Sequence, residues 1–263
     1  MDYQKIKIKG LKGVEELSYL EGCFFPNPTT NRFARAINKN GGIKEGDLVF
    51  DIGTGIAPLA IWAALQGAGR VIGVDPVKIH CESARQNVIN YSLEGKVDIY
   101  QGGFFGPFNT QPKLKGLQAD VIIGDVSGIS DAVSKEKGLG WYSNEVPTGG
   151  PDGTDVIIEF LKRAHKEKHL KKGGQMYFPI ATDLSDGDKI LKVVQELYGG
   201  PTSVLEVVFP LTPEQVLRID ESFKESDDFN RKTPGFINIR GRNSKRKGKF
   251  ELSWTGHIYS VTV

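Results

Sequence analysis

The feature that most constrains the fold is the run LVFDIGTGIAPLAIWAALQGAGRVIGVDP at residues 48–76. An apolar strand leads to Asp51, a loop with Gly53 and Gly55 follows, and a helix opens at Pro58. Glycines let a backbone approach a ligand closely and adopt φ values that other residues resist. The helix behind such a loop presents free N–H groups to a carboxylate or a phosphate. The run therefore predicts a strand–loop–helix unit that binds a ligand at its loop.

Apolar and amphipathic segments alternate along most of the chain. Strands separated by helices predict a doubly wound α/β fold whose mainly parallel sheet is covered on both faces. The expected strands are residues 48–52, 71–74, 97–100, 121–123 and 175–180, and the expected helices are residues 58–66, 78–91, 155–169 and 188–198. After residue 200, TSVLEVVFPL, GFINIR and KFELSWTGHIYSV predict a late antiparallel addition, and TPEQVLRIDESFKES predicts a helix.

The domain organisation follows from the same pattern. Residues 1–44 predict an N-terminal extension with an edge strand near Lys5–Lys9 and a short helix from about Thr30 to Lys39. We expect this extension, from Phe24 to Arg35, to form a lid over the cofactor and the substrate. Residues 45–263 predict the main domain, which carries a basic hairpin near residues 240–249.

Composition excludes several classes of protein. The net charge of +2 does not make the whole molecule a polyanion binder. No stretch approaches the roughly 18 apolar residues that span a bilayer, and the first residues lack the apolar core of a signal peptide. The two cysteines, Cys23 and Cys81, are too few for a zinc site or a disulfide framework. We therefore expect a reduced, cytoplasmic protein with no metal and no membrane contact.

A second acidic residue, Asp75, limits the kinds of ligand that the site can bind. Gly73-Val74-Asp75 puts a carboxylate at the end of the neighbouring strand, where a ribose diol is bound by two O–H···O⁻ bonds. A nicotinamide cofactor normally asks for G-x-G-x-x-G/A, and the third position here is Pro58. In S-adenosylmethionine a methionine moiety replaces the pyrophosphate, and Asp51 can attract its ammonium or sulfonium group. The sequence favours S-adenosylmethionine and keeps a nicotinamide-dependent oxidoreductase as an alternative.

Two stretches carry a family resemblance. DIGTGIAPLAI followed by VIGVDPVKIHCESARQNV resembles motifs I and II of class I S-adenosylmethionine-dependent methyltransferases, over roughly residues 46–182. The resemblance implies a seven-stranded, Rossmann-like, mainly parallel sheet with an antiparallel last strand. It also implies that the glycine loop holds the methionine part and that Asp75 holds the ribose. The candidate cofactor-binding residues are Asp51, Gly53, Thr54, Gly55, Asp75, Pro76, Gly103, Phe104 and Asp125.

The adenine end departs from the family pattern. Members of the family often have an Asp after the third strand to bind the adenine amino group, and Gly102 or Gly103 stands there in this chain. We expect backbone N–H groups and apolar contact with Phe104 to take over that role. For Phe104 and Phe105, ordinary core packing is the alternative.

A closer resemblance concerns the acceptor. GGPDGTDVIIEFLKRAHKEKHLKKGGQMYFPI and FFPNPTTNRFARAI resemble HemK-like methyltransferases, which modify protein glutamine. That group carries Asn/Asp-Pro-Pro-Tyr after the fourth strand, whereas residues 125–128 here are Asp-Val-Ser-Gly. The acid is kept, and both prolines and the aromatic ring are absent. Asp125 and Ser127 are the candidate catalytic residues, and a strand-end turn or a general base are the other interpretations of Asp125.

Three further features have weaker support. The segment around Phe25 and Thr30 and the loop with Trp141 and Tyr142 are the candidate substrate pocket, and one of the loop aromatics could replace the missing ring. His165 and His169 share a predicted helix face with lysines, so a solvated face is favoured over a metal site. RGRNSKRKGK at residues 240–249 has six cations, and an exposed turn is favoured over a phosphate-tracking arm.

The sequence thus predicts a methyltransferase that acts on a nitrogen atom of a protein. The alternatives are a small-molecule N- or O-methyltransferase, an rRNA or tRNA methyltransferase, and an S-adenosylmethionine-binding module without catalysis. Nucleic acid ranks behind a protein or small-molecule acceptor, and the sequence indicates no oligomeric state.

Overall fold

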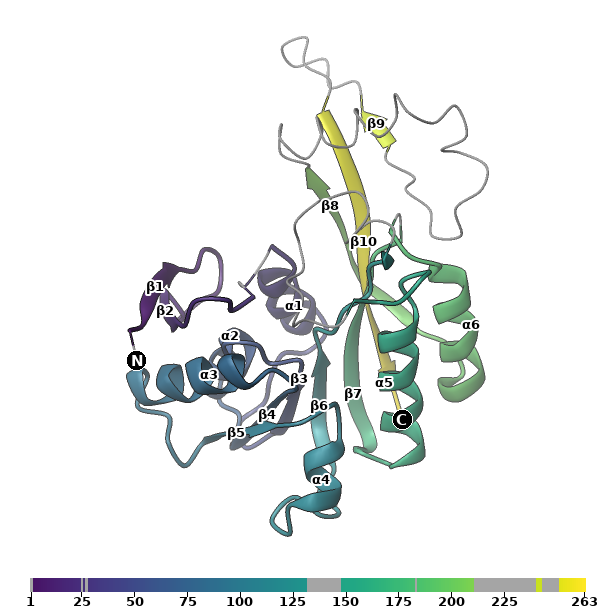
Figure 1. Cartoon of the computed structure of the whole chain (residues 1–263). Coiled ribbons are helices and arrows are strands. Elements are labelled where there is room, and N and C mark those ends of the chain that lie inside the picture. The colour runs from purple at the N-terminus through teal and green to yellow at the C-terminus, as the bar shows by residue number, and fades with distance from the viewer. Residues whose placement is uncertain are drawn as a thin grey trace.

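The computed structural model describes residues 2–24, 26, 28–131, 148–182, 184–210, 240–242 and 251–263. The strands of its main sheet are β3 (Leu48–Ile52), β4 (Arg70–Asp75), β5 (Val97–Gln101), β6 (Ala119–Gly124), β7 (Leu170–Ile180), β8 (Thr202–Pro210), β9 (Arg240–Arg242) and β10 (Glu251–Thr262). The strand order is β5-β4-β3-β6-β7-β10-β8, with β9 paired to β10 (Figure 1). Strands β3 to β7 run parallel, and β10 is antiparallel to both β7 and β8. The predicted seven-stranded α/β sheet with an antiparallel last strand is confirmed.

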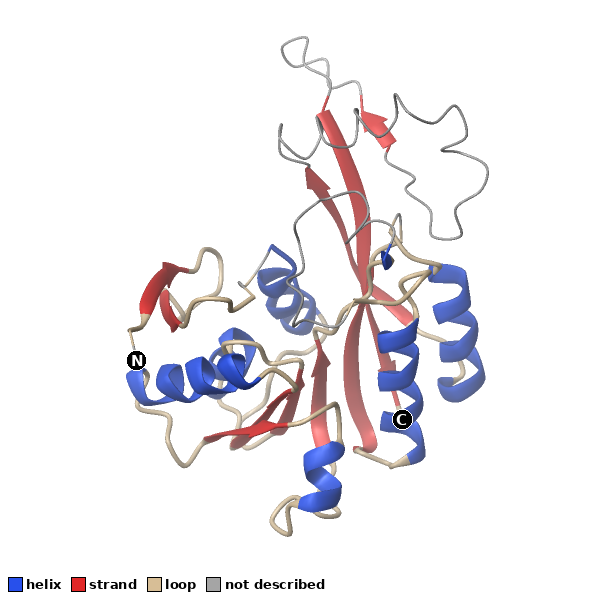
Figure 2. Cartoon of the chain, in the orientation of Figure 1, coloured by secondary structure: helices blue, strands red, loops and turns tan. Residues whose placement is uncertain are grey.

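Helices cover both faces of the sheet (Figure 2). Their bounds are α1 (Pro28–Lys39), α2 (Pro58–Leu65), α3 (Lys78–Asn90), α4 (Gly106–Thr110), α5 (Asp155–Lys166) and α6 (Gly187–Tyr198). Buried side chains of α1, α2 and α3 belong to one hydrophobic cluster, and those of α4, α5 and α6 belong to a second. The central strands are therefore buried on both sides, which explains why they are apolar throughout rather than alternating.

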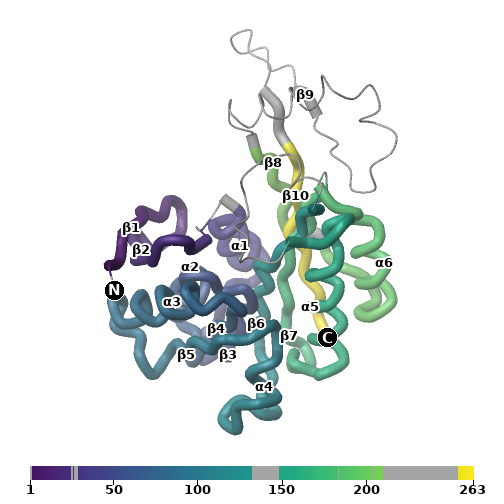
Figure 3. Tube along the Cα trace, in the orientation of Figure 1, coloured from purple at the N-terminus to yellow at the C-terminus, as the bar shows by residue number. Residues whose placement is uncertain are grey.

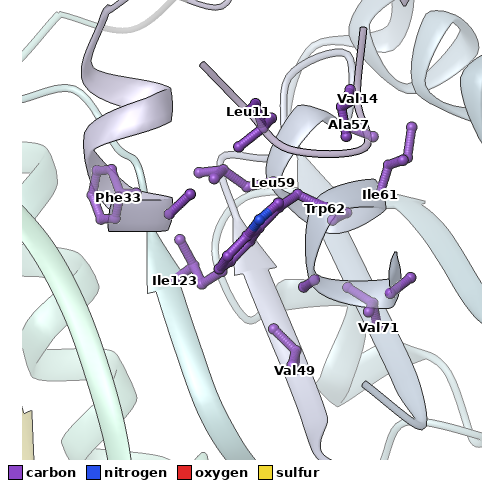
Figure 4. Packing of buried hydrophobic residues seen from close by; sticks show 14 of the residues in the cluster. Leu11, Val14, Phe33, Val49, Ala57, Leu59, Ile61, Trp62, Val71 and Ile123 are labelled. Atoms are coloured by element: carbon purple, nitrogen blue, oxygen red, sulfur yellow. The ribbon is translucent and has the colours of Figure 1, made fainter. Parts of the chain in front are cut away.

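Helix α2 lies at the centre of the first cluster. Its residues from Pro58 to Ala64 are all buried, because its sequence is apolar on every side of the helix. Trp62 is 1% exposed and packs between the sheet and the N-terminal segment, which contributes Leu11 and Val14 (Figure 4). This packing holds the glycine loop at the start of α2 in one position.

The N-terminal strand does not join the main sheet. β1 (Gln4–Lys7) pairs with β2 (Glu16–Tyr19), a strand that the sequence pattern did not predict, and forms a separate two-stranded sheet beside α3 (Figure 3). The Asn87 side chain of α3 accepts a bond from Ser18 N at 2.7 Å and donates to Ser18 O and Ile56 O, each at 2.9 Å. Side-chain bonds therefore fasten this hairpin to α3 and to the loop before α2.

The helix predicted over residues 155–169 is too long by three residues, because α5 ends at Lys166. Lys168 takes a left-handed backbone conformation (φ 55°), and β7 begins at Leu170. The lysines and glycines at 171–174, just after the range predicted for this helix, belong to β7. The solvated helix face predicted for His169 is also wrong: the residue is 6% exposed, and its ring stacks on Phe105 with centroids 4.2 Å apart.

Two helices also differ from the prediction. α4 was not predicted, and α1 begins at Pro28, two residues before the predicted start. The helix predicted from Pro213 lies outside the described residues, and the basic run is described only at 240–242, where the backbone forms β9. Within the described ranges, no helix is both long and apolar enough to cross a membrane.

Candidate functional site

A cavity of about 320 Å³ lies at the carboxyl edge of the parallel strands. Open α/β sheets bind their ligands along this edge. It brings together most of the residues predicted from sequence: Thr30, Gly53, Thr54, Gly55, Asp75, Pro76, Gly103, Phe104, Asp125 and Ser127. Its volume is at the lower end of the range typical of small-molecule sites.

The glycine loop forms the floor of the cavity. Gly53 has φ 79° and Gly55 has φ 56°, both in the region that favours glycine. A Cβ atom on Gly53 would lie 2.9 Å from the carbonyl oxygen of Asp125, so only glycine lets β3 and β6 approach this closely. Nothing lies within 4 Å of the corresponding position on Gly55. The loop is therefore tight against the protein at Gly53 and open at Gly55.

Asp75 is held by three donors. Its Oδ2 accepts a bond from Gly55 N at 2.9 Å, and its Oδ1 accepts from Val77 N at 2.9 Å and from His80 Nδ1 at 3.0 Å. Since Phe24 N donates to His80 Nε2 at 3.0 Å, the His80 proton must sit on Nδ1. A carboxylate offers about four lone-pair sites, so these contacts leave room for one further bond at Oδ2.

Asp51 lies beneath the loop rather than in the cavity. It is 1% exposed, it is not among the lining residues, and its Oδ2 accepts a bond from Thr54 Oγ1 at 2.7 Å. Burial raises its pKa to about 7, the nearby Asp125 charge adds to the rise, and the Thr54 bond opposes it. Any attraction of a cationic ligand by Asp51 therefore acts through its electric field and not through contact.

Asp125 follows β6 directly and reaches the cavity from the side opposite Asp75. Burial raises its pKa to about 7, and a hydrogen bond from Thr30 of α1 lowers it. Thr30 is itself 5% exposed, so α1 packs against the site that the sheet provides. The structure thus places the predicted strand-end acid and the N-terminal helix together.

The two phenylalanines after β5, Phe104 and Phe105, point to different environments. Phe104, with φ 44°, lines the cavity together with Gly103. Phe105 is fully buried and stacks between His169 and Phe160, with ring centroids 4.2 Å and 5.9 Å away. One ring is available to a ligand, and the other packs in the core.

Sequence reasoning missed several lining residues and named others that cannot be placed. His80 and Val156 line the cavity and were not predicted, whereas Phe24 lines it as part of the N-terminal segment predicted to close over the cofactor. For His80, the signal was its place in the first turn of the helix after the acid. Phe25, Trp141 and Tyr142 lie outside the described residues. In the described part of the chain, no three His, Cys, Asp or Glu side chains could together hold a metal ion.

The hydrogen-bond donors and the charges around the glycine loop discriminate between a cofactor with a pyrophosphate and one with a cationic amino-acid tail. Pro58 at the first turn of α2 has no N–H, which removes one of the donors that a pyrophosphate uses. Asp51 and Asp125 each have a pKa of about 7, so at neutral pH they carry part of a negative charge beneath and beside the loop, which repels a pyrophosphate and attracts a cationic group. The residues present therefore fit a nucleoside that carries a positively charged amino-acid tail.

Fold and site together define the class: by its architecture, the chain has the fold of class I S-adenosylmethionine-dependent methyltransferases. S-adenosylmethionine is the cofactor of this class, as predicted from the glycine loop. The family model of ribosomal protein L11 methyltransferase (PrmA) matches residues 27–127, a span that holds the glycine loop, Asp75 and Asp125.

Three relatives illustrate the match. A ribosomal protein L11 methyltransferase of Carboxydothermus hydrogenoformans is 31% identical over 131 residues, which is 50% of this chain and 39% of the relative. The structure of the T. thermophilus 16S rRNA N2 G1207 methyltransferase in complex with AdoMet and guanosine is similar with a TM-score of 0.56 and 18% identity, covering 78% of this chain and 47% of that one. The ribosomal protein L11 methylase of Lactobacillus delbrueckii subsp. bulgaricus has a TM-score of 0.50 and 16% identity, covering 93% of this chain and 84% of that one.

The curated matches are partial. They span between 27% and 45% of the length of the L11 methyltransferases concerned. The two structural likenesses, below 25% identity, show the fold alone. The comparisons support the predicted class of methyltransferase, and they lead to the L11 methyltransferases rather than to the HemK-like group.

Proposed function

We propose that the chain is an enzyme that transfers a methyl group from S-adenosylmethionine to a nitrogen atom of a protein. The observation that carries the proposal is a single cavity with Asp75 on one side and Asp125 on the other, joined by the glycine loop. In this proposal, one carboxylate binds the nucleoside and the other acts on the group that reacts.

Each residue has a separate task in this proposal. Asp75 receives a ribose hydroxyl at the open lone pair of Oδ2, while His80 and two backbone N–H groups keep the carboxylate in position. Gly53, Thr54 and Gly55 hold the amino-acid tail, and Phe104 contacts the adenine ring. When bound, S-adenosylmethionine supplies an electrophilic methyl group. The bond from the methyl carbon to the sulfonium sulfur breaks on transfer, and the sulfur leaves as a neutral thioether.

Asp125 acts on the acceptor. Its carboxylate accepts a hydrogen bond from the acceptor N–H, which orients the nitrogen lone pair toward the methyl group. A protonated amine must lose a proton before it can react, and a carboxyl group with a pKa of about 7 can take that proton at neutral pH. Ser127 lies in the same lining and is proposed to contact the acceptor.

Residues 1–44 are proposed to cover this site. Phe24, Pro26 and Thr30 line the cavity, and Phe24 N is bonded to His80. The N-terminal segment therefore touches both the residue that positions Asp75 and the cavity itself, as a lid must.

The proposed acceptor is a ribosomal protein, because the family model and the curated relatives are ribosomal protein L11 methyltransferases. Methylation of a glutamine side chain of another protein, the HemK-like reaction predicted from the sequence, is the alternative protein acceptor. A small-molecule acceptor, an RNA acceptor and a binding module without catalysis are separated from it by the same experiment.

The experiment incubates the chain with S-adenosylmethionine labelled in the methyl group and with separated ribosomal-protein, RNA and small-molecule fractions of a bacterial extract. We expect label in the ribosomal-protein fraction with the wild type and none with Asp125→Asn. Cofactor binding, measured by calorimetry, should be kept in that variant. Label in the RNA or small-molecule fraction alone would refute the protein acceptor. Cofactor binding with no label in any fraction would refute the enzyme.

A further inference from the structure

A second cavity adjoins the first at Asp125. Its volume is about 70 Å³, and it shares Asp125 and Val126 with the larger cavity. One wall is the end of β7, at Pro179 and Ile180, and the other is formed by β8 and β10. Asp125 therefore stands at the junction of two cavities, one of which fits the cofactor.

The second wall extends beyond the sheet. His257 of β10 pairs with Ile180, the last residue of β7, while residues 253–256 of β10 continue past that point, paired with β8. In Figure 1 this part of β8 and β10 rises above the carboxyl ends of the parallel strands as a two-stranded ribbon. We call it the β8–β10 ribbon. It stands beside the edge at which ligands bind in such sheets.

A pair of aromatic rings covers the ribbon's inner face. Phe209 and Trp254 are opposite each other on the two strands, and their rings stack with centroids 4.0 Å apart and planes 16° apart. Gly256 makes room for them, because a Cβ atom there would lie 3.1 Å from the Trp254 ring and 3.3 Å from the Phe209 ring. Glycine within a strand often marks such a close approach.

We propose that the methyl acceptor reaches Asp125 through this second cavity and that the Phe209–Trp254 pair determines which acceptor fits. The inference rests on the proposed function and deepens it. The stacked pair takes the place of the aromatic ring that is absent after β6, although it comes from a different part of the chain.

The chemistry of the lining selects a protein side chain as the occupant. Among the described residues that line the second cavity there is no Lys or Arg, so a nucleic-acid phosphate finds no cationic partner. The lining is apolar apart from Thr29, Asp125 and His257. A narrow apolar passage with a carboxylate at its inner end suits an apolar stem with one nitrogen-bearing head.

The kinetic experiment measures methyl transfer by variants of the full chain. The substrates are labelled S-adenosylmethionine and the protein that takes up the label in the experiment described above. Trp254→Ala is expected to raise the acceptor KM at least tenfold, to change kcat less, and to leave the cofactor Kd within twofold. Trp254→Phe, which keeps a ring, should recover most of the loss. Val208→Ala is the matched control, because it shortens an apolar side chain of β8 on the opposite face and should leave KM unchanged.

An acceptor KM for Trp254→Ala within twofold of the wild type would overturn the proposal. An equal rise in the cofactor Kd would also overturn it, because it would indicate general damage to the cofactor site. A turnover-independent arm uses 5-fluorotryptophan protein saturated with S-adenosylhomocysteine, with the Trp254 fluorine resonance identified by its loss in Trp254→Phe.

n-Butylamine or propionamide, as probes of an amine or amide side chain, should shift that resonance saturably, and adenosine monophosphate should not. A shift by neither probe, or by adenosine monophosphate alone, would overturn the second cavity as the acceptor site. A wild type that shows the shift without methylating any protein would refute the proposed function and leave the second cavity as a binding site for an amine or amide side chain.

Discussion

Removal of the Asp51 charge should stabilise the protein at neutral pH and not at acid pH. Asp51 has an ordinary pKa of 3.8 that burial raises to about 7, so the folded chain keeps a proton that the unfolded chain has lost. Stability is therefore lost as pH rises from about 4 to about 7, and it stays level above that. At about 1.4 kcal/mol per pKa unit, the whole window is worth about 4 kcal/mol. About 2.5 kcal/mol of this falls between pH 5 and pH 8.

The assay is urea unfolding of the wild type and Asp51→Asn at pH 5, 6, 7 and 8. Asparagine keeps an oxygen that can accept the Thr54 bond and has no charge to bury. Between pH 5 and pH 8, the free energy of unfolding of the variant should rise by about 2.5 kcal/mol relative to that of the wild type. Glu94→Gln, which removes an exposed acid, is the control and should follow the wild type. A difference between Asp51→Asn and the wild type that does not change with pH would show that burial does not raise the pKa of Asp51.

Three further results are expected. Asp75→Ala should abolish S-adenosylmethionine binding in calorimetry, while Asp125→Ala should keep binding and lose turnover; normal turnover of the second variant would show that the acceptor site is misassigned. The affinity for S-adenosylmethionine relative to S-adenosylhomocysteine should rise by up to about tenfold from pH 6 to pH 8, because a sulfonium favours ionised Asp51 and Asp125 and a thioether does not; a constant ratio would contradict this. Gly53→Ala should unfold more easily and bind the cofactor at least tenfold more weakly, since its Cβ meets Asp125 at 2.9 Å, whereas Gly95→Ala, also at positive φ but with open space around it, should affect stability alone; equal cofactor affinities in the two variants would exclude the clash.

The unit from β3 to β4 could be predicted because its signals are local. An apolar run, two glycines and a helix-opening proline occur within eleven residues, and the strand bounds agree with the prediction to within a residue. Asp125 is far from this unit in sequence. Its place in the site followed from one general property, that parallel strands end at the same edge of a sheet.

The remaining features depend on contacts between distant residues. The bond from Phe24 to His80 joins residues 56 positions apart, and no spacing rule indicates it. His169 looks like part of a helix face in the sequence, and only the fold shows that it fills the aromatic cluster around Phe105. Asp51 has the position of a ligand contact in the motif, and the Thr54 hydroxyl holds it under the loop instead.

The residues proposed to contact the methyl acceptor were the hardest to predict from the sequence. The sequence indicated that an aromatic ring was missing after β6 and directed attention to the loop with Trp141. Phe209 and Trp254 come from strands near the end of the chain, and they reach the site only because β8 and β10 extend past β7. Strand length relative to a neighbour depends on register, which the local pattern does not specify.

A crystal structure of the full chain with S-adenosylmethionine would test directly whether the cofactor binds between Asp75 and Asp125. We expect density in the cavity of about 320 Å³, with a ribose hydroxyl on Asp75 Oδ2, the adenine ring against Phe104 and the methyl group facing Asp125. Density for the cofactor elsewhere, or in this cavity with the methyl group turned away from Asp125, would contradict this placement.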